Sequence, residues 1–278
     1  MSEPNAPHLD HHQGPHAGTP IWTRYVAIGD SFTEGMVDTD PDDPDRFVGW
    51  ADRLATALSA RAAAEKLPFS YANLAVRGRK LDDVVGPQLD RALAMDPDLV
   101  SIVGGGNDLL RPRVDIDSLA DRIEDAVVRL RAAGADVLLA TPTDTRDAGL
   151  FKALRGRHAT HTANLFTIAQ RHECSVLNLW GMKSIRDWRM WGEDRIHLNT
   201  EGHSRVVDAA LVALGQAPSR PDWDEPLDAA DRAARADELR QHAEWVKVHA
   251  APWVQRRVRG TSSGDQLVAK RPDLTPFD

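Results

Sequence analysis

Short runs of apolar residues alternate with longer amphipathic stretches along most of the chain. The five apolar runs are typical of buried strands, and they cover residues 25–28, 69–76, 98–103, 137–140 and 175–179. The stretches after them space their apolar residues at helical intervals, over residues 46–65, 81–95, 116–133, 150–172 and 206–214. Strands that alternate with helices in this way predict an α/β fold with a doubly wound, parallel, five-stranded sheet.

The two ends of the chain lack this alternation. Residues 1–20 are rich in Pro, Gly, His and Asp, and we expect a disordered arm without a secretion signal. One folded domain is expected over residues 21–216. Residues 217–278 begin with a connection rich in Pro and Asp, and they predict a helical C-terminal extension with a charged helix over about 227–248. A polar tail is expected from Gly260 onwards.

Alternating acidic residues between Asp38 and Asp45 resemble the start of a calcium-binding loop. An EF-hand requires Gly at its sixth position and Glu at its twelfth, and this chain has Asp43 and Gly49 there. We therefore predict a solvated loop that leads into a helix at Asp45, and no metal site.

Composition narrows the classes of function. The formal net charge of −8 argues against a nucleic-acid partner, because such proteins usually present a basic face. No apolar run reaches the about 18 residues needed to span a membrane, so we expect a cytoplasmic protein. The single cysteine, Cys174, lies in an apolar run and is predicted to be a buried structural thiol. No phosphate-binding glycine motif or histidine pair with metal-ligand spacing stands out, so neither a cofactor nor a metal is expected.

Four breaks rich in small or polar residues punctuate the apolar pattern, and each carries a residue of chemical interest. Ser31 directly follows the first strand, Gly78 lies after the second, and Asn107 follows the third. Asp194 and His197 lie together just before the last helix. Because the carboxyl ends of parallel strands meet at one edge of a sheet, these side chains are expected to converge.

The converging residues include each group that acyl transfer to a serine requires. A serine hydroxyl needs an imidazole base, and the base needs a carboxylate that holds its tautomer. We predict that His197 takes the proton of Ser31 and that Asp194 orients His197. The oxyanion of the tetrahedral intermediate needs donors aimed at it in advance. The backbone N–H groups of Ser31 and Gly78 and the side-chain amide of Asn107 are predicted to supply them.

Other polar residues near these breaks have competing interpretations. Asp187 is a rival for the orienting acid, although Asp194 has the better spacing to His197. Asp30 and Asp108 are expected to fix their turns through local hydrogen bonds. Three tryptophans form either a substrate-facing wall or part of the core, and they are Trp180, Trp188 and Trp191.

These blocks, in this order, resemble the SGNH hydrolases, also called GDSL-type esterases and lipases. The family's Ser, Gly, Asn, His and acid fall on Ser31, Gly78, Asn107, His197 and Asp194, within a match over about residues 23–215. Phe32 stands where the family name has leucine. The resemblance implies a three-layer, flavodoxin-like fold and hydrolysis of carboxylic esters, with a small-molecule ester as the partner.

Two alternative functions use the same fold. One is a catalytically silent binding module, and the other is acyl transfer to an alcohol. The nucleophile elbow of α/β-hydrolases is disfavoured, because Thr33 occupies the position where that motif needs glycine. The sequence indicates neither the acyl group nor the oligomeric state.

Overall fold

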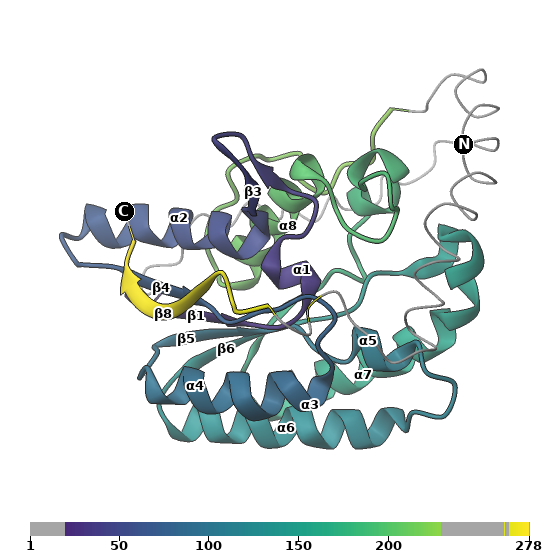
Figure 1. Ribbon diagram of the computed structural model, residues 1–278, viewed down its shortest axis with the longest axis horizontal. Coiled ribbons are helices and arrows are strands. Elements are labelled where there is room, and N and C mark those ends of the chain that lie inside the picture. The colour runs from purple at the N-terminus through teal and green to yellow at the C-terminus, as the bar shows by residue number, and fades with distance from the viewer. Residues whose placement is uncertain (1–19, 229–263, 265–266, 278) are drawn as a thin grey trace, which may run out of the picture.

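The sheet of the computed structural model lies between two layers of helices (Figure 1). The structure describes residues 20–228, 264 and 267–277. The sheet contains, in the order β7-β6-β5-β1-β4-β8, the strands Ser175–Leu177, Asp136–Ala140, Leu99–Ile102, Arg24–Ile28, Ser70–Asn73 and Arg271–Pro276. The first five of these are parallel, and β8 pairs antiparallel to β4. The predicted α/β fold with a parallel, doubly wound sheet is confirmed.

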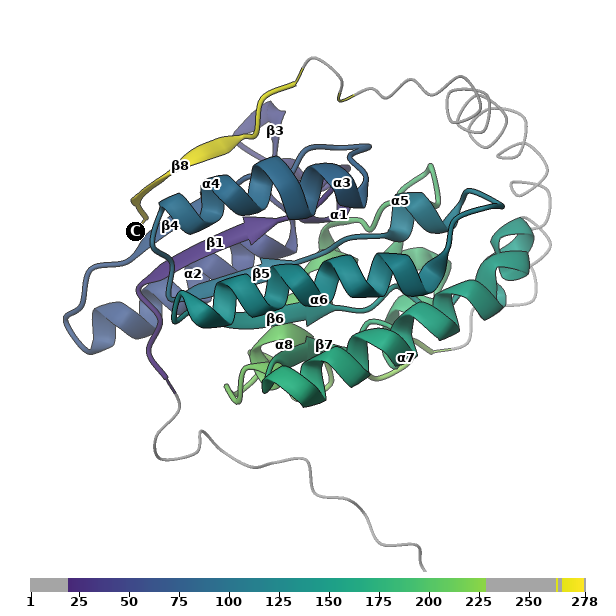
Figure 2. The ribbon, with the colours of Figure 1, turned by 90° about the horizontal axis from the view of Figure 1, so that it is seen from below.

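The helices cover both faces of the sheet. One layer contains α2 (Gly49–Ala64) and α8 (Thr200–Ala213), which pack against each other. The other layer contains α4 (Leu89–Ala94), α6 (Ile116–Ala132) and α7 (Arg155–His172), which cover the opposite face in Figure 2. The remaining short elements are α1 (Ser31–Glu34), α3 (Leu81–Asp83), η1 (Val84–Gln88), α5 (Gly106–Leu109), η2 (Thr145–Asp147), η3 (Gly149–Leu154), η4 (Ser184–Arg186) and η5 (Trp188–Met190).

Strand β1 explains why the core has two halves. Its side chains alternate, so Tyr25 and Ala27 pack with Trp50 of α2 on one face. Val26 and Ile28 pack on the other face, with apolar residues of α6. Every residue from position 25 to 28 is fully buried. Because both faces of the strand are buried, its sequence is a continuous apolar run, as is typical of parallel strands.

The sixth strand is the main difference from the predicted topology. The polar tail expected from Gly260 includes β8, which has the sequence RPDLTP and lies at the edge of the sheet. Proline is tolerated at an edge because one side of such a strand has no ladder partner. The strand shows little apolar alternation, so its position depends on pairing with β4, about two hundred residues earlier in the chain.

The acidic segment after α1 also differs from the prediction. Instead of a loop with a helix start at Asp45, it forms a hairpin of β2 (Thr39–Asp40) and β3 (Asp43–Phe47). Helix α2 then begins at Gly49, whose φ is 78°. A Cβ atom added to Gly49 would lie 2.4 Å from the Cα of Gly35, so the two backbones approach too closely for any side chain.

The stretch predicted as one helix over 81–95 is divided into α3, η1 and α4. Pro87 lies inside η1, where a proline has no N–H to donate, and the backbone there follows a wider π-helical turn. The side chain of Gln88 consequently reaches β1. Its Oε1 accepts from Gly29 N at 2.8 Å and its Nε2 donates to Gly29 O at 3.0 Å, which fixes the backbone two residues before Ser31.

Other helix boundaries shift without changing the order of elements. The stretch predicted as a helix from residue 150 begins with the 3₁₀ helix η3. Helix α8 begins at Thr200, and Asn199 is its N-cap, because its side chain accepts from Gly202 N. Within the described residues, no helix has the length and apolar character needed to cross a membrane. The predicted helix over 227–248 and the N-terminal arm lie outside the described residues, apart from one or two residues at their inner ends.

Two buried histidines link the stability of the fold to pH. His161 is fully buried, and its Nε2 lies 3.3 Å from Gly104 O. Burial lowers the pKa of His161 to about 4, against a smaller opposing effect of this hydrogen bond. Burial similarly lowers the pKa of His203 to about 3, although Asp38 opposes the shift. Both rings therefore stay neutral in the folded protein under mildly acidic conditions.

We expect the free energy of unfolding to fall as the pH is lowered from 7 to 5. A histidine in the unfolded chain titrates near 6.5, so the unfolded state binds protons in this range that the folded state cannot bind. For His161 alone the loss is about 2 kcal/mol. Urea denaturation at both pH values measures it. In His161→Gln, which does not titrate, the loss should be smaller by about that amount, and an unchanged pH dependence would contradict this account.

Candidate active site

Ser31 is the first residue of α1 and follows β1 at the carboxyl edge of the sheet. Asp30 is the N-cap of this helix, and its Oδ1 accepts from Phe32 N at 3.1 Å. Asp30 therefore fixes its own turn, as predicted. This turn fixes the direction in which the short helix presents its serine.

The structure brings Ser31, His197 and Asp194 into one hydrogen-bonded chain. Ser31 Oγ lies 2.9 Å from His197 Nε2, although 166 residues separate them. His197 Nδ1 lies 2.6 Å from Asp194 Oδ2. Because a carboxylate can only accept, Nδ1 carries the proton, and Nε2 is left to accept from the serine hydroxyl.

The turn between the acid and the histidine is shaped by the backbone. Asp194 Oδ1 accepts from the N–H groups of Ile196 and His197, both at 3.0 Å. Arg195 adopts a left-handed conformation with φ of 50°, which closes the turn. Burial raises the pKa of Asp194, but the hydrogen bond and charge of His197 outweigh it, and the net effect lowers the pKa. The carboxylate is therefore ionised at neutral pH.

Asn107 lines the pocket beside Ser31, and Gly78 lies outside that lining, in the loop that Asn107 contacts. Gly78 has a φ of 76°, which favours glycine. Asn107 Nδ2 donates to Arg79 O at 2.8 Å and to Asp30 Oδ2 at 3.1 Å. The amide of Asn107 is thus tied both to the loop that contains Gly78 and to the turn that presents Ser31. The four predicted blocks meet at one edge of the sheet.

Two neighbouring acids differ in role from the groups around Ser31. Asp108 was expected to fix its own turn, but its Oδ2 accepts from Leu81 N, 27 residues earlier in the chain, so it joins two loops. Burial raises the pKa of Asp108. Asp187, the rival acid, is the N-cap of η5 and accepts from the guanidinium of Arg189 at 2.6 Å. The carboxylate that contacts His197 is that of Asp194.

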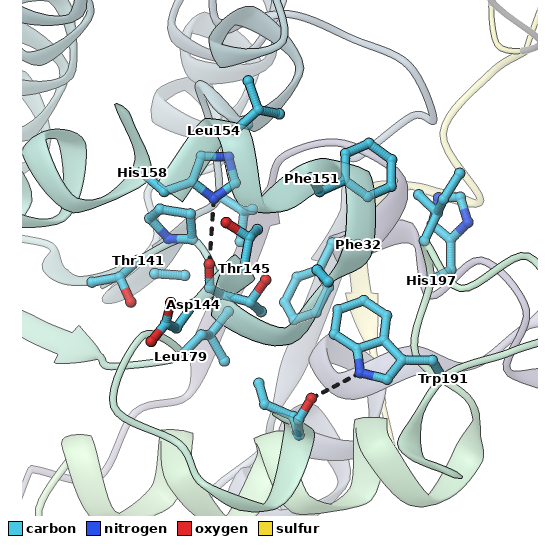
Figure 3. Close-up of a pocket in the computed structure, with 18 of the residues that line it drawn as sticks. Phe32, Thr141, Asp144, Thr145, Phe151, Leu154, His158, Leu179, Trp191 and His197 are labelled. Atoms are coloured by element: carbon cyan, nitrogen blue, oxygen red, sulfur yellow. Dashed lines mark hydrogen bonds between the residues drawn. The ribbon is translucent and has the colours of Figure 1, made fainter. Parts of the chain in front are cut away.

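A pocket of about 230 Å³ opens beside Ser31 and His197. In Figure 3 it extends from His197 past Phe32 and Phe151 towards His158. Its apolar lining comes mainly from Phe32, Val103, Leu110, Pro142, Ala148, Phe151, Leu154, Leu179, Ile185, Trp188, Trp191 and Ile196. Most of these side chains belong to segments that follow strands β5, β6 and β7, so the pocket lies at the same sheet edge as the serine.

Two of the three tryptophans near the acid lie in the wall of the pocket, and the third, Trp180, is half-buried and belongs to neither the wall nor the two core clusters. Trp188 and Trp191 line the pocket, and their ring centroids lie 6.1 Å apart. Trp191 also donates from Nε1 to Ile185 O at 2.8 Å, which fixes its ring in the wall, as Figure 3 shows. Trp180 lies outside the lining, and the guanidinium of Arg155 covers its ring at 5.3 Å.

The remaining candidate groups are not assembled for metal or thiol chemistry. Among the residues that the structure describes, no group of three or more His, Cys, Asp or Glu side chains could hold a metal ion. Cys174 is half-buried rather than fully buried as predicted, and burial raises the pKa of its thiol to about 11. Because the thiolate is the reactive form, this cysteine is a poor nucleophile at neutral pH.

Two interactions that support the site were not predicted from the sequence. Glu34 accepts from Arg77 N at 2.7 Å, and its carboxylate also pairs with the Arg77 guanidinium. The second interaction is that of Gln88 with the backbone of Gly29. Neither has a signal in the local sequence, because both depend on loops that meet only after the sheet has formed.

The chain matches a known protein family over more than half of its length. The family model of the GDSL-like Lipase/Acylhydrolase family matches residues 27–205. No curated protein matches the chain significantly. Several solved structures share its fold at low sequence identity. A crystal structure of TesA is 22% identical, with a TM-score of 0.54 over 68% of this chain and 97% of that chain.

Two further structures cover 71% of this chain and 97% of theirs. Axe2, an acetylxylan esterase from Geobacillus stearothermophilus, is 20% identical with a TM-score of 0.57. LAE5, an alpha/beta hydrolase enzyme from the metagenome of Lake Arreo in Spain, is 23% identical with a TM-score of 0.58. The family match includes all four blocks that surround Ser31, and the chain therefore belongs to the GDSL-like lipase and acylhydrolase family.

Proposed function

We propose that this protein is a serine esterase that cleaves carboxylic esters through an acyl-enzyme on Ser31. The observation that carries the proposal is the continuous chain of hydrogen bonds from Ser31 Oγ through His197 to Asp194. A serine hydroxyl is a weak nucleophile until a base removes its proton, and this geometry supplies the base and its orienting acid.

The proposed reaction follows from the positions of these groups. Ser31 Oγ attacks the ester carbonyl while His197 Nε2 accepts its proton, and Asp194 stabilises the imidazolium that forms. His197 then gives the proton to the leaving alcohol. A water molecule, activated by the same histidine, cleaves the acyl-enzyme and regenerates the free serine.

The negative charge that develops on the carbonyl oxygen also needs partners. The N–H groups of Ser31 and Gly78 and the amide of Asn107 are the proposed donors. Asn107 is already fixed by Arg79 O, and Gly78 presents no side chain to an approaching substrate. Donors that are fixed before the reaction stabilise the transition state without reorganising, and each contributes about 10²- to 10³-fold in kcat.

The pocket supports a substrate with an apolar group of several carbons. Its walls are mainly aromatic and aliphatic, and it opens directly at Ser31 and His197. Each buried methylene gains about 0.8 kcal/mol, which is about a fourfold gain in affinity. We therefore expect kcat/KM for p-nitrophenyl esters to increase from acetate to longer acyl chains.

Replacing Ala148 with tryptophan should reverse this preference. Ala148 lines the pocket between η2 and η3, and a larger side chain there would occupy the space of the substrate. The ratio of kcat/KM for octanoate to that for acetate should fall by about 10-fold or more. Ala153→Trp is the matched control, because Ala153 is exposed on η3 and lies outside the pocket lining. Equal ratios in the two variants would contradict the assignment of this pocket.

The proposed function is tested by ester hydrolysis together with covalent labelling. The purified protein is incubated with a panel of p-nitrophenyl esters, and separately with a fluorophosphonate probe that reacts with activated serines. We expect turnover of at least one ester and a single labelled peptide that contains Ser31. A protein that neither hydrolyses an ester nor reacts with the probe is instead a binding module on the same fold.

Product analysis with added alcohol distinguishes hydrolysis from acyl transfer. In this assay an esterase releases free acid, whereas an acyltransferase transfers the acyl group from Ser31 to the alcohol and forms a new ester. We expect free acid as the main product at low alcohol concentration, because water is then by far the more abundant acceptor.

A further inference from the structure

The segment after the family domain reaches the back of the proposed active site. Lys270 lies just before β8, and its ammonium inserts between α1 and α2. Its Nζ donates to Glu34 O at 2.6 Å, Phe47 O at 2.9 Å and Val48 O at 2.7 Å. It also forms an ion pair with the carboxylate of Asp52. The side chain of Lys270 is only 18% exposed.

The contact with Glu34 connects Lys270 to the nucleophile. Helix α1 contains only four residues, with Ser31 at its first position and Glu34 at its last. A cation at the C-terminal end of a helix binds carbonyl groups that have no partner within the helix. Lys270 therefore holds the carbonyl end of the same single turn that presents Ser31 at its other end.

Glu34 also carries the connection to the proposed oxyanion loop. Its carboxylate accepts from Arg77 N at 2.7 Å and pairs with the Arg77 guanidinium, and Arg77 directly precedes Gly78. Gly264 packs against the same loop, since a Cβ atom added there would lie 2.1 Å from Arg77 O. The C-terminal segment thus contacts both the nucleophile helix and the loop that contains Gly78.

Several contacts fix the position of Lys270 itself. Strand β8 pairs with β4, and Ser59 Oγ donates to Phe277 O at 2.8 Å. The ring of Phe277 packs against Phe69 and Tyr71 at centroid distances of 6.4 and 5.3 Å. The lysine is therefore held by a paired strand and by an aromatic cluster, which limits how far its ammonium can move.

We propose that Lys270 is a positioning residue for the esterase reaction. Through Glu34 it fixes the position of Ser31 relative to the loop that contains Gly78. The inference rests on the proposed function. It assigns a role in catalysis to a segment beyond the matched residues 27–205 of the family. A buried ammonium is costly to desolvate, and the three carbonyl groups and Asp52 offset part of that cost.

Lys270→Met tests the proposal because it keeps an unbranched side chain that can fill the space of the lysine stem but removes the cation. We expect kcat and the rate of fluorophosphonate labelling at Ser31 to fall about 10- to 100-fold, because small misplacements of a nucleophile are that costly. KM should stay within about threefold of the wild-type value, since Lys270 lies outside the pocket lining. All rates are measured at a temperature where circular dichroism shows each variant to be folded.

Two control variants separate positioning from stability. Asp52→Asn removes the charged partner of Lys270 but leaves the three carbonyl contacts, so it should lower the melting temperature and slow labelling less than Lys270→Met does. Asp273→Asn changes an exposed ion pair of β8 with Arg91 and should alter neither quantity. Lys270→Leu, which lacks both the charge and the N–H donors, is used if Lys270→Met is not folded.

The outcomes distinguish this inference from the proposed function. If the wild-type protein neither labels at Ser31 nor hydrolyses an ester, the proposed function fails. If the wild type reacts and a folded Lys270 variant labels at the wild-type rate, the inference alone is overturned. The inference is also overturned if Asp52→Asn and Lys270→Met slow labelling equally, because the effect then follows the loss of the buried ion pair.

Discussion

Replacing Ser31 with alanine is expected to lower kcat for ester hydrolysis about 10⁶-fold, and His197→Ala should lower it by a similar factor. The two side chains act as one unit, because Ser31 Oγ and His197 Nε2 are 2.9 Å apart and the proton passes between them. The double variant should therefore be little worse than either single variant. The measurement is initial-rate hydrolysis of a p-nitrophenyl ester by purified protein.

The matched controls are a serine and a histidine elsewhere in the same chain. Ser118 is exposed near the start of α6, and His172 lies at the end of α7 beside Glu124. Ser118→Ala and His172→Ala should hydrolyse the ester at rates close to wild type. Turnover by Ser31→Ala that matches the wild-type protein would exclude Ser31 as the nucleophile.

Asp194→Asn is expected to lower kcat about 10⁴-fold while leaving the protein folded. The reason lies in the two oxygens of Asp194. Oδ1 accepts from the N–H groups of Ile196 and His197, so the carbonyl oxygen of an asparagine would occupy that position. Its amide nitrogen would then face His197 Nδ1 and donate to it. The imidazole proton would move to Nε2, which could no longer accept from Ser31.

Asp187→Asn is the control for this substitution. Asp187 lies near the same loop, but its carboxylate is engaged with the backbone and guanidinium of Arg189. We expect kcat for this variant within about threefold of wild type, because the change does not affect the tautomer of His197. Equal losses of kcat in the two variants would show that the orienting acid has been assigned wrongly.

The candidate site was predictable because its residues lie at interruptions of strong local patterns. Ser31 follows a strand that is buried on both faces, and Asn107 follows another such strand. Parallel strands bring their carboxyl ends to one edge, so residues far apart in sequence could be expected to meet there. Asp194 and His197 are three residues apart, and one turn of backbone is enough to join them.

The parts that were not predicted depend on contacts between distant segments. Strand β8 carries prolines and charges instead of an apolar alternation, and it is held by pairing with β4. The hairpin before α2 is stabilised by Asp38, whose carboxylate accepts from Gly49 N and Arg53. The local sequence of such segments is also compatible with a loop, and they form strands because of their contacts with neighbouring parts of the fold.

The sequence by itself determined the five parallel strands and the order of the helical segments between them, the family, and the residues that converge on Ser31. It could do so because apolar periodicity and short motifs are local features of the sequence. In addition, only a few chain topologies can connect parallel strands through helices. Tertiary structure alone decided the sixth strand, the apolar pocket and the contact of Lys270 with the carbonyl end of α1. The physical reason is that a lysine in a polar tail has no local pattern that marks it as buried. Its position depends on carbonyl groups that about 220 residues of intervening chain bring within reach of its ammonium.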